Sequence, residues 1–410
     1  MQSQGPVTGH PPALPRAETD FRALGMFSVL LLAYALMAAD RYLFPVLAPD
    51  VRHELSFSLS STGLLSTIFT LGLAIGGLPT GYLLSRLSRK TVLLAGIAIF
   101  SAATAMTAIA TGFWSMLVCL AATGVGMAML ATVMFTLASS YFSRNRGAAI
   151  GSVNLCYGLG AIIGPLLAGA LLMAYGTWRA PMAAFGSFGL AIVGLIVMTV
   201  RRRFTETQRT VEARTTSGGA ATLLNRNTIL LTAMSLAHGL ILYGFLGLYP
   251  TFLRESLHYA ARTTGEVMSF FGMGALLSIA GGWLGDRFSP RTVLGTAFLC
   301  MSALGYVVFH GPQTVWAQSA LSCLYGVISS AVLYVNLAGY HVKAVRTSLA
   351  SRSSGLFVTS LYGTSAVAGY SMGWLANQGG WGLAGGIQIS VLSAIAACMA
   401  LGLRPAAMSR

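Results

Sequence analysis

The sequence has little charge and few acids. Of its 410 residues only 9% are Asp, Glu, Lys or Arg, and Asp and Glu together number 10, whereas 55% are hydrophobic. A soluble protein of this length needs more charged side chains to cover its surface, which argues against a soluble enzyme. The mean hydropathy of +0.72 indicates instead an integral membrane protein in which the lipid bilayer surrounds the chain.

Cysteine and catalytic motifs are scarce as well. The five cysteines lie inside apolar stretches without Cys-x-x-Cys spacing, so neither a disulfide framework nor a zinc site is indicated. The sequence has no HExxH motif, no phosphate-binding glycine loop and no nucleophile elbow. We therefore expect no enzyme, no cofactor and no bound metal, and a nucleotide-driven pump is excluded on the same ground.

Twelve apolar segments, each long enough to cross a bilayer, fill most of the chain. We expect an all-α protein with spans at 24–48, 60–84, 91–110, 114–139, 147–175, 181–200, 227–253, 264–285, 291–310, 313–340, 349–376 and 381–403. The predicted divisions are a disordered tail at 1–22, a six-helix half at 23–200, a linker at 201–226, a second six-helix half at 227–403 and a tail at 404–410.

The net charge of +15 does not indicate nucleic-acid binding, because the basic residues gather in alternate loops between the spans. Three such residues are Arg86, Arg89 and Lys90, whereas the opposite loops hold few. By the positive-inside rule, the basic loops, the linker and both termini face the cytoplasm. Abundant Ala, Gly and Arg suit a bacterial protein, and the location would then be the inner membrane.

One stretch organises the chain because it occurs twice. Gly81–Leu93 returns as Gly282–Leu294, with Gly, Leu, Arg, Ser, Thr, Val and Leu identical in register. Both copies resemble the signature loop G-x-x-x-D-R-x-G-R-[KR] of the major facilitator superfamily. The matching residues, which the resemblance makes candidates for gating, are Gly81, Arg86, Arg89 and Lys90 in the first copy and Gly282, Asp286, Arg287 and Arg291 in the second.

This resemblance implies two pseudo-symmetric six-helix bundles, a substrate site between them near the midplane, and alternating access. It also implies a monomer. Ser85 stands where the family has its first Asp, so an asymmetric latch is expected, in which only Asp286 holds its side of the membrane shut through charge. Lys343, Arg346 and Arg352 are the candidate partners of Asp286, whereas Arg144 and Arg146 are those of the first loop.

Asp40-Arg41 is the one charged pair well inside a span. An ionised side chain in hydrocarbon is costly, so the pair is expected to face the protein interior or a water-filled cavity. It resembles the first helix of the anion:cation symporters and the spinster-like lipid transporters, although their Asn-Tyr is absent and Leu120 replaces an Arg of many relatives. The resemblance implies proton coupling at Asp40 and binding of an anionic group at Arg41.

Other polar residues in the spans are candidates for lining a substrate cavity. They are Tyr34, Asn154, Tyr157, His238, Tyr243, Tyr334, Asn336 and Tyr362. Each of them is also explained by an ordinary contact between helices. His238 follows Met234 by one helical turn, a spacing that can hold a soft metal ion or place His238 for a proton or hydrogen-bond role.

Span 5 carries closely spaced small residues, which let helices pack tightly in a membrane. Gly160, Gly164, Pro165 and Gly169 are the expected packing residues, and they resemble the G-x-x-x-G-P-x-x-G-G motif of proton-driven exporters except at Ala168. The leading interpretation is a secondary transporter of a small organic solute, an organic anion, driven by protons or by exchange. A proton-coupled exporter of amphipathic drugs or lipids is the alternative, and a metal transporter is a weaker one.

Overall fold

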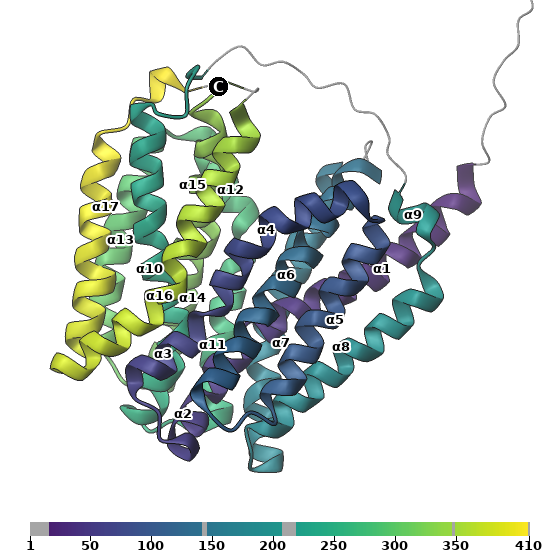
Figure 1. The fold of residues 1–410 in the computed structure, drawn as a ribbon. Coiled ribbons are helices and arrows are strands. Elements are labelled where there is room, and N and C mark those ends of the chain that lie inside the picture. Colours follow the sequence, from purple (N-terminus) through teal and green to yellow (C-terminus); the bar gives the residue numbers. More distant parts are fainter. Residues whose placement is uncertain (1–15, 142–145, 207–218, 347–348, 409–410) are drawn as a thin grey trace, which may run out of the picture.

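The computed structural model describes residues 16–141, 146–206, 219–346 and 349–408, and these ranges are almost wholly helical (Figure 1). Within them, 11 helical segments are long and apolar enough to cross a membrane, of which the last, Arg352–Leu401, has 50 residues. Such a helix would be roughly 75 Å long, more than twice the thickness of a bilayer core. Because its backbone leaves helical geometry at Gly379 and Gly380, it forms two spans. The described chain is thus consistent with the twelve spans that the sequence predicts.

Six spans make up the first half, followed by one short helix. Its helices are α1 (Arg16–Asp40), α2 (Leu43–Leu55), α3 (Leu59–Thr67), α4 (Phe69–Arg86), α5 (Arg89–Thr107), α6 (Phe113–Tyr141), α7 (Arg146–Tyr175), α8 (Arg179–Thr199) and α9 (Arg202–Glu206). The first span consists of α1 and α2, and the second consists of α3 and α4.

The second half repeats this plan. Its helices are α10 (Arg226–Glu255), α11 (Ala261–Ala275), α12 (Ser278–Arg287), α13 (Pro290–His310), α14 (Val315–Tyr325), the π-helix η2 (Gly326–Tyr334), α15 (Val335–Lys343), α16 (Ala350–Gly385), the π-helix η4 (Gly386–Val391), α17 (Leu392–Leu401) and the 3-10 turn η5 (Pro405–Ala407). The eighth span consists of α11 and α12. The tenth contains η2, and π-helical turns of this kind often mark functional sites.

The two halves meet through backbone contacts that only glycine permits. A Cβ on Gly63 of α3 would lie 2.1 Å from the carbonyl oxygen of Gly369 in α16. A Cβ on Gly265 of α11 would lie 2.3 Å from that of Pro165 in α7. Small residues allow this approach where lipid supplies no hydrophobic drive between helices. The second span thus packs on the eleventh and the eighth on the fifth, as a pseudo-twofold arrangement requires.

Figure 1 shows that the two bundles lie close together at the end that carries α2 and α3 and separate toward the end that carries α9 and the C terminus. We call the first end the closed face and define it by the ends of α2 and α10, at Leu55 and Glu255. The other end carries both copies of the repeated loop and is called the signature-loop face.

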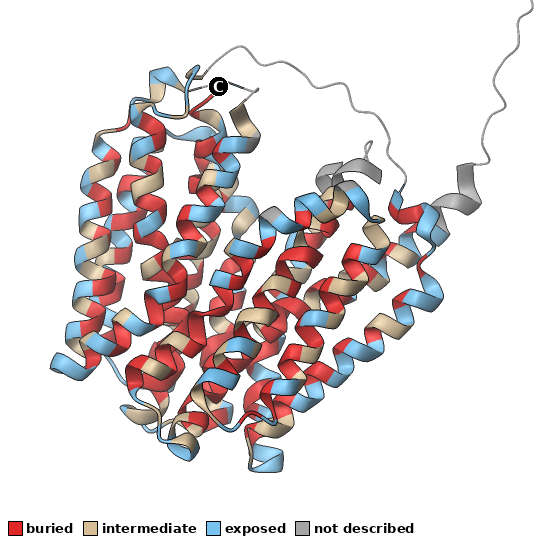
Figure 2. Ribbon diagram, viewed as in Figure 1, coloured by how far each residue is buried: buried red, intermediate tan, exposed pale blue. Residues whose placement is uncertain are grey.

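Much of the exposed surface is apolar, as a bilayer requires. Side chains such as Met198 at 86% and Ile279 at 85% exposure point outward, whereas buried residues concentrate inside the bundles and where these meet (Figure 2). A surface of this kind is stable only in contact with hydrocarbon. The chain is a multi-pass membrane protein.

The predicted tail and linker are described only in part. Residues 1–15 and 207–218 lie outside the described ranges, and α1 begins at Arg16, inside the predicted tail. The end of the linker is tied to the second half, because the backbone N–H of Ala220 donates to Ala344 and its carbonyl accepts from Arg346. The predicted divisions of the chain stay predictions.

Candidate functional site

The first membrane span is interrupted near its middle. α1 ends at Asp40 and α2 begins at Leu43, with a turn at Arg41 and Tyr42. Pro45 accounts for the position of this turn, because proline has no N–H to donate to the carbonyl of the residue four places earlier. That carbonyl belongs to Arg41. The turn therefore places Arg41 at the break in a span that runs from residue 22 to 55.

The two members of the charged pair face different helices. Asp40 is buried, with 7% exposure, and its Oδ2 accepts a hydrogen bond from Thr104 Oγ1 of α5 at 3.0 Å. No basic side chain lies in ion-pair range of Asp40 in the part of the chain that is described. Arg41 points instead toward the helices where the halves meet.

Close packing of α7 on α1 brings a tyrosine to Arg41. A Cβ on Gly164 would lie 2.4 Å from the carbonyl oxygen of Ala39, and one on Gly160 would lie 2.6 Å from the Cβ of Ala38. Because both positions are glycine, the two helices touch along their backbones. Tyr157, one turn before Gly160 on α7, consequently reaches the guanidinium group.

Four aromatic residues surround Arg41, and we call Phe69, Tyr157, Tyr243 and Tyr362 the Arg41 cage. Nη1 of Arg41 donates to the hydroxyl of Tyr157 at 3.0 Å and to that of Tyr243 at 3.4 Å. The guanidinium carbon lies 5.5 Å from the ring centroid of Phe69, 5.4 Å from that of Tyr157 and 5.9 Å from that of Tyr362. These distances allow cation–π attraction.

Both halves of the protein build the cage. Phe69 comes from α4 and Tyr157 from α7, whereas Tyr243 comes from α10 and Tyr362 from α16. The rings of Tyr243 and Tyr362 lie edge to face at 6.0 Å. The hydroxyl of Tyr362 also lies 3.3 Å from that of Tyr334 in η2. A ligand bound here would contact both halves at once.

The charge of Arg41 has no acidic partner among the described residues. Its hydrogen bonds go to neutral hydroxyls, and its buried Nε has no hydrogen-bond partner within the described chain. Arg41 itself remains partly exposed. Neutral phenols and ring faces compensate a positive charge only in part, so the guanidinium group has the capacity to bind an anion.

Of three further predicted residues, two have contacts with neighbouring helices and one is exposed. Tyr34 packs edge to face against Phe135 of α6 at 6.1 Å. Asn154 is exposed on α7, three residues before Tyr157. Asn336 donates from Nδ2 to the carbonyls of Gly281 and Val332, both at 2.9 Å, so its amide ties the tenth span to the eighth.

His238 lies away from the cage contacts. It is fully buried on α10 and packs against Phe298 of α13, with 6.3 Å between ring centroids. Within those ranges, no three His, Cys, Asp or Glu side chains gather as metal ligands would, so the described structure adds no support to the metal alternative.

Sequence reasoning missed two aromatic residues at the site, Tyr42 and Phe69. The hydroxyl of Tyr42 lies 3.4 Å from that of Tyr157, and Phe69 forms one wall of the cage. Tyr42 directly follows the charged pair in a segment that Pro45 interrupts. This position in the sequence could have indicated that Tyr42 belongs to the site. Phe69 sits at the break between α3 and α4, and no pattern in the sequence marks that break.

The sequence profile of the Major Facilitator Superfamily matches residues 30–369. This chain belongs to that superfamily. The hexuronate transporter of Bacillus subtilis (strain 168) is 24% identical to it over 388 residues, covering 88% of this chain and 90% of that protein. The gallate transporter of Pseudomonas putida is 25% identical over 341 residues, covering 73% and 75%.

A solved structure has the same fold. It is that of a bacterial homologue of the human lysosomal transporter Spinster in an inward-facing and occupied conformation, with a TM-score of 0.72 and 16% identity, covering 92% of this chain and 94% of that one. The all-α superfamily fold that the repeated loop predicts is thereby confirmed.

The two superfamily signature loops share one local structure. Ser88 Oγ accepts from the N–H of Thr91 at 3.2 Å, and Ser289 Oγ accepts from that of Thr292 at 3.3 Å. Both serines are N-caps of the helix that follows. Arg86 likewise stacks on the ring of Tyr82, and Arg287 on that of Trp283. The duplication thus preserves structure as well as sequence.

Matching basic residues of the two loops bind the end of the last span in their own half. Lys90 Nζ donates to the carbonyls of Val200 at 2.6 Å and Val197 at 3.3 Å, after α8 and within it. Arg291 Nε donates to the carbonyl of Leu403, after α17. Cations are favourable at helix C termini. Gly81 and Gly282 have no close contact at the Cβ position.

Asp286 has a cation partner within its own half. Lys343 Nζ lies 2.7 Å from Asp286 Oδ1, and the Asp286 side chain is 76% exposed. Lys343 was one of the expected partners. In the first loop the side chain of Ser85 and those of Arg144 and Arg146 lie outside the described residues, while Arg89 Nη1 donates to the carbonyl of Thr205 at 3.4 Å.

Ion pairs join the two halves at the closed face. Arg254 of α10 binds both carboxylate oxygens of Asp50 in α2, with 3.1 Å between Nη2 and Oδ1. Arg52 of α2 pairs with Glu255 of α10. Each helix therefore presents one acid and one base to the other. The contact of Gly169 with Ala261, where a Cβ would lie 2.6 Å from a carbonyl oxygen, lies at the same face.

Proposed function

We propose that this superfamily member is a secondary transporter of a small organic anion and that Arg41 binds the carboxylate of its substrate. The observation that carries the proposal is the unpaired guanidinium of Arg41 where the two halves meet, bounded by rings from both halves. A guanidinium stays charged and binds carboxylate through two parallel hydrogen bonds.

The relatives support the same class of substrate. Hexuronate and gallate, named in the two transporters above, are both organic carboxylates. Their identities to this chain, 24% and 25%, leave the specific substrate open. The chemistry of the Arg41 cage favours some organic carboxylates over others as the substrate.

The cage favours a planar, unsaturated carboxylate over a polyhydroxylated sugar acid. Its walls are four aromatic rings. Two buried amides of the second half, those of Asn336 and Gln388, are engaged in helix packing, whereas the amide of Asn154 on α7 is exposed. Asn336 bonds to two backbone carbonyls, and Gln388 donates to those of Leu240 at 3.0 Å and Ala368 at 2.8 Å. A flat ring packs against aromatic faces and leaves few polar groups unpaired.

Asp40 is the candidate for proton coupling. It is buried beside Thr104 without a basic partner in the described chain, and it directly precedes the break that carries Arg41. Taking up or releasing a proton would change the charge next to this break. Alternating access then follows from a ligand held by both halves, which rock about the site. We further propose a monomer in the bacterial inner membrane with the signature-loop face toward the cytoplasm.

The alternative reading, export of amphipathic compounds, depends on the charge of the cargo. The positive charge of Arg41 repels cationic drugs, whereas an amphipathic anion would fit the same cage. Comparing ligands of different charge and shape therefore distinguishes the two interpretations.

The test is ligand-induced thermal stabilisation of the purified protein. Gallate, benzoate, glucuronate and the cation tetraphenylphosphonium are compared in wild type, Arg41→Ala, Arg41→Lys and the control Arg22→Ala, which removes an exposed arginine from the same span. Losing the charged hydrogen bonds should cost about 1.5–3 kcal/mol, or roughly 10- to 150-fold in affinity.

We expect stabilisation by benzoate or gallate that disappears in Arg41→Ala, persists weakly in Arg41→Lys and is unchanged in Arg22→Ala. Stronger stabilisation by glucuronate would overturn the aromatic preference alone. Stabilisation by tetraphenylphosphonium only, or by carboxylates equally in Arg41→Ala, would overturn the proposed function. Uptake of the stabilising compound into proteoliposomes then measures transport.

A further inference from the structure

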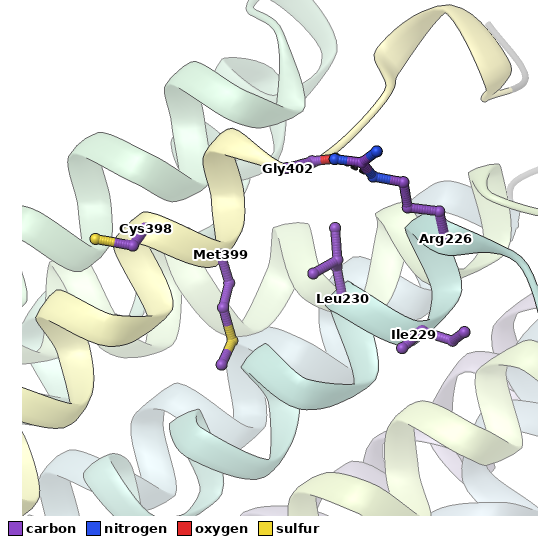
Figure 3. A pocket seen from close by; sticks show the side chains of 6 residues that line it. All are labelled: Arg226, Ile229, Leu230, Cys398, Met399 and Gly402. Atoms are coloured by element: carbon purple, nitrogen blue, oxygen red, sulfur yellow. Dashed lines mark hydrogen bonds between the residues drawn. The ribbon is translucent and has the colours of Figure 1, made fainter.

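The end of α17 is flanked by two surface grooves. The first lies between α10 and α17, has a volume of about 520 Å³ and is lined by Arg226, Ile229, Leu230, Cys398, Met399 and Gly402 (Figure 3). The second lies between α13 and α17 and has a volume of about 290 Å³. Its lining residues include Arg291, Leu299 and Leu401. Cys398 lines both grooves.

Each groove combines an apolar wall with one arginine. Figure 3 shows Arg226 extending from α10 toward Gly402. Its Nε donates to the carbonyl of Gly402 at 2.9 Å, and Arg291 Nε donates to the carbonyl of Leu403. These bonds fix both guanidinium groups beside the end of α17. They use the Nε atoms only, so the Nη groups of the two exposed arginines can bind a further acceptor.

A third basic residue belongs to the same surface. Arg404 follows α17 and is exposed, and Asn227 of α10 fixes its backbone through hydrogen bonds of 2.7 and 2.9 Å. No acidic side chain is among the described residues that line either groove. The ends of the grooves therefore form a positively charged surface.

Lipid is the solvent of this part of the molecule. α17 and α13 lie on the side of the second half that faces away from the first half (Figure 1). Ile229, Leu299 and Leu401 are exposed by 54%, 59% and 69%. The grooves consequently open toward the bilayer rather than toward the Arg41 cage, and acyl chains are the apolar molecules available to fill them.

We propose that these grooves bind an anionic phospholipid, with acyl chains along α17 and the phosphate on the guanidinium groups of Arg226 and Arg291. Basic pockets between membrane helices are suited to anionic head groups, and arginine binds phosphate through two hydrogen bonds. The binding site is independent of the proposed substrate site. It would brace α10, which carries Tyr243, against α17.

Cys398 provides a local readout. In a variant whose other four cysteines are replaced by serine, the rate of Cys398 modification by N-ethylmaleimide is measured in micelles with added dioleoylphosphatidylglycerol or dioleoylphosphatidylcholine. The anionic lipid should slow the reaction at lower concentrations than the zwitterionic lipid. Replacing either arginine by glutamine should weaken this protection roughly fivefold, equivalent to about 1 kcal/mol.

Two further variants separate lipid binding from folding. Arg226→Lys with Arg291→Lys keeps the charge and should retain most of the protection, whereas Arg22→Gln removes a charge near the start of α1 and should have no effect. Equal protection by both lipids, or unchanged protection by the anionic lipid in Arg226→Gln with Arg291→Gln, would overturn the proposal. Melting temperatures without added lipid identify any variant that has lost its fold.

Discussion

The closed face should open when its ion pairs between the halves are broken. Arg254→Gln removes the cation that binds both oxygens of Asp50 across the two halves. The side chains of this pair are 20% and 29% exposed, which is between a surface pair and a buried one. The pair stabilises only those conformations in which this face is closed.

The size of the effect follows from this partial burial. Exposed ion pairs contribute about 0.2–1 kcal/mol and hydrogen bonds to charged groups about 1.5–3 kcal/mol. For this bidentate pair we expect about 1–2 kcal/mol, which shifts the ratio of closed to open molecules roughly 5- to 30-fold. High salt should reduce the contribution, because part of the pair is in contact with water.

The assay is pulsed electron paramagnetic resonance between spin labels on Thr111 and Gln313, which lie in closed-face loops of the first and second half. Arg254→Gln should add a population at longer distance. The control is Arg262→Gln, because the ion pair of Arg262 with Glu266 lies within α11 and does not connect the two halves. This control should leave the distance distribution unchanged.

Exchanging the two charges of the pair tests whether ion pairing holds this face closed. Asp50→Arg combined with Arg254→Asp restores the pair in reverse and should return the distribution toward that of wild type. If Arg254→Gln leaves the distances unchanged, or if Arg262→Gln lengthens them equally, ion pairing between the halves does not hold this face shut.

Three further predictions concern other parts of the mechanism. Gly265→Ala places a Cβ 2.3 Å from the carbonyl oxygen of Pro165, so the same distance measurement should show opening; an unchanged distribution would contradict tight backbone contact. Asp286→Asn should lower the initial rate of gallate uptake into proteoliposomes more than Ser85→Ala does, and equal, wild-type-like rates would refute an asymmetric latch. Asp40→Asn should abolish the stimulation of uptake by an inward proton gradient but keep gallate exchange, whereas a retained pH response would exclude Asp40 as the coupling group.

Much of the fold could be predicted from local sequence because a membrane span must satisfy its backbone hydrogen bonds internally. The apolar runs therefore indicated twelve spans. The predicted first span at 24–48 is shorter than the observed helices, since α2 continues to Leu55 beyond the apolar run. Asp50 lies in this extension of α2, and Arg254 lies in the last turn of α10. Hydropathy does not show that these two side chains meet.

Composition and internal repetition were enough to mark the charged pair and the pseudo-symmetry. A charged Asp40 and Arg41 within hydrocarbon are costly enough to stand out in any span, and the duplicated loops define the pseudo-symmetry. The partners of these side chains depend on how the helices pack. Phe69 and Tyr362 come together at Arg41 from different halves, whereas Asn336 is engaged in helix packing. The breaks and tilts of helices that are far apart in sequence determine which side chains meet, and local sequence does not contain this information.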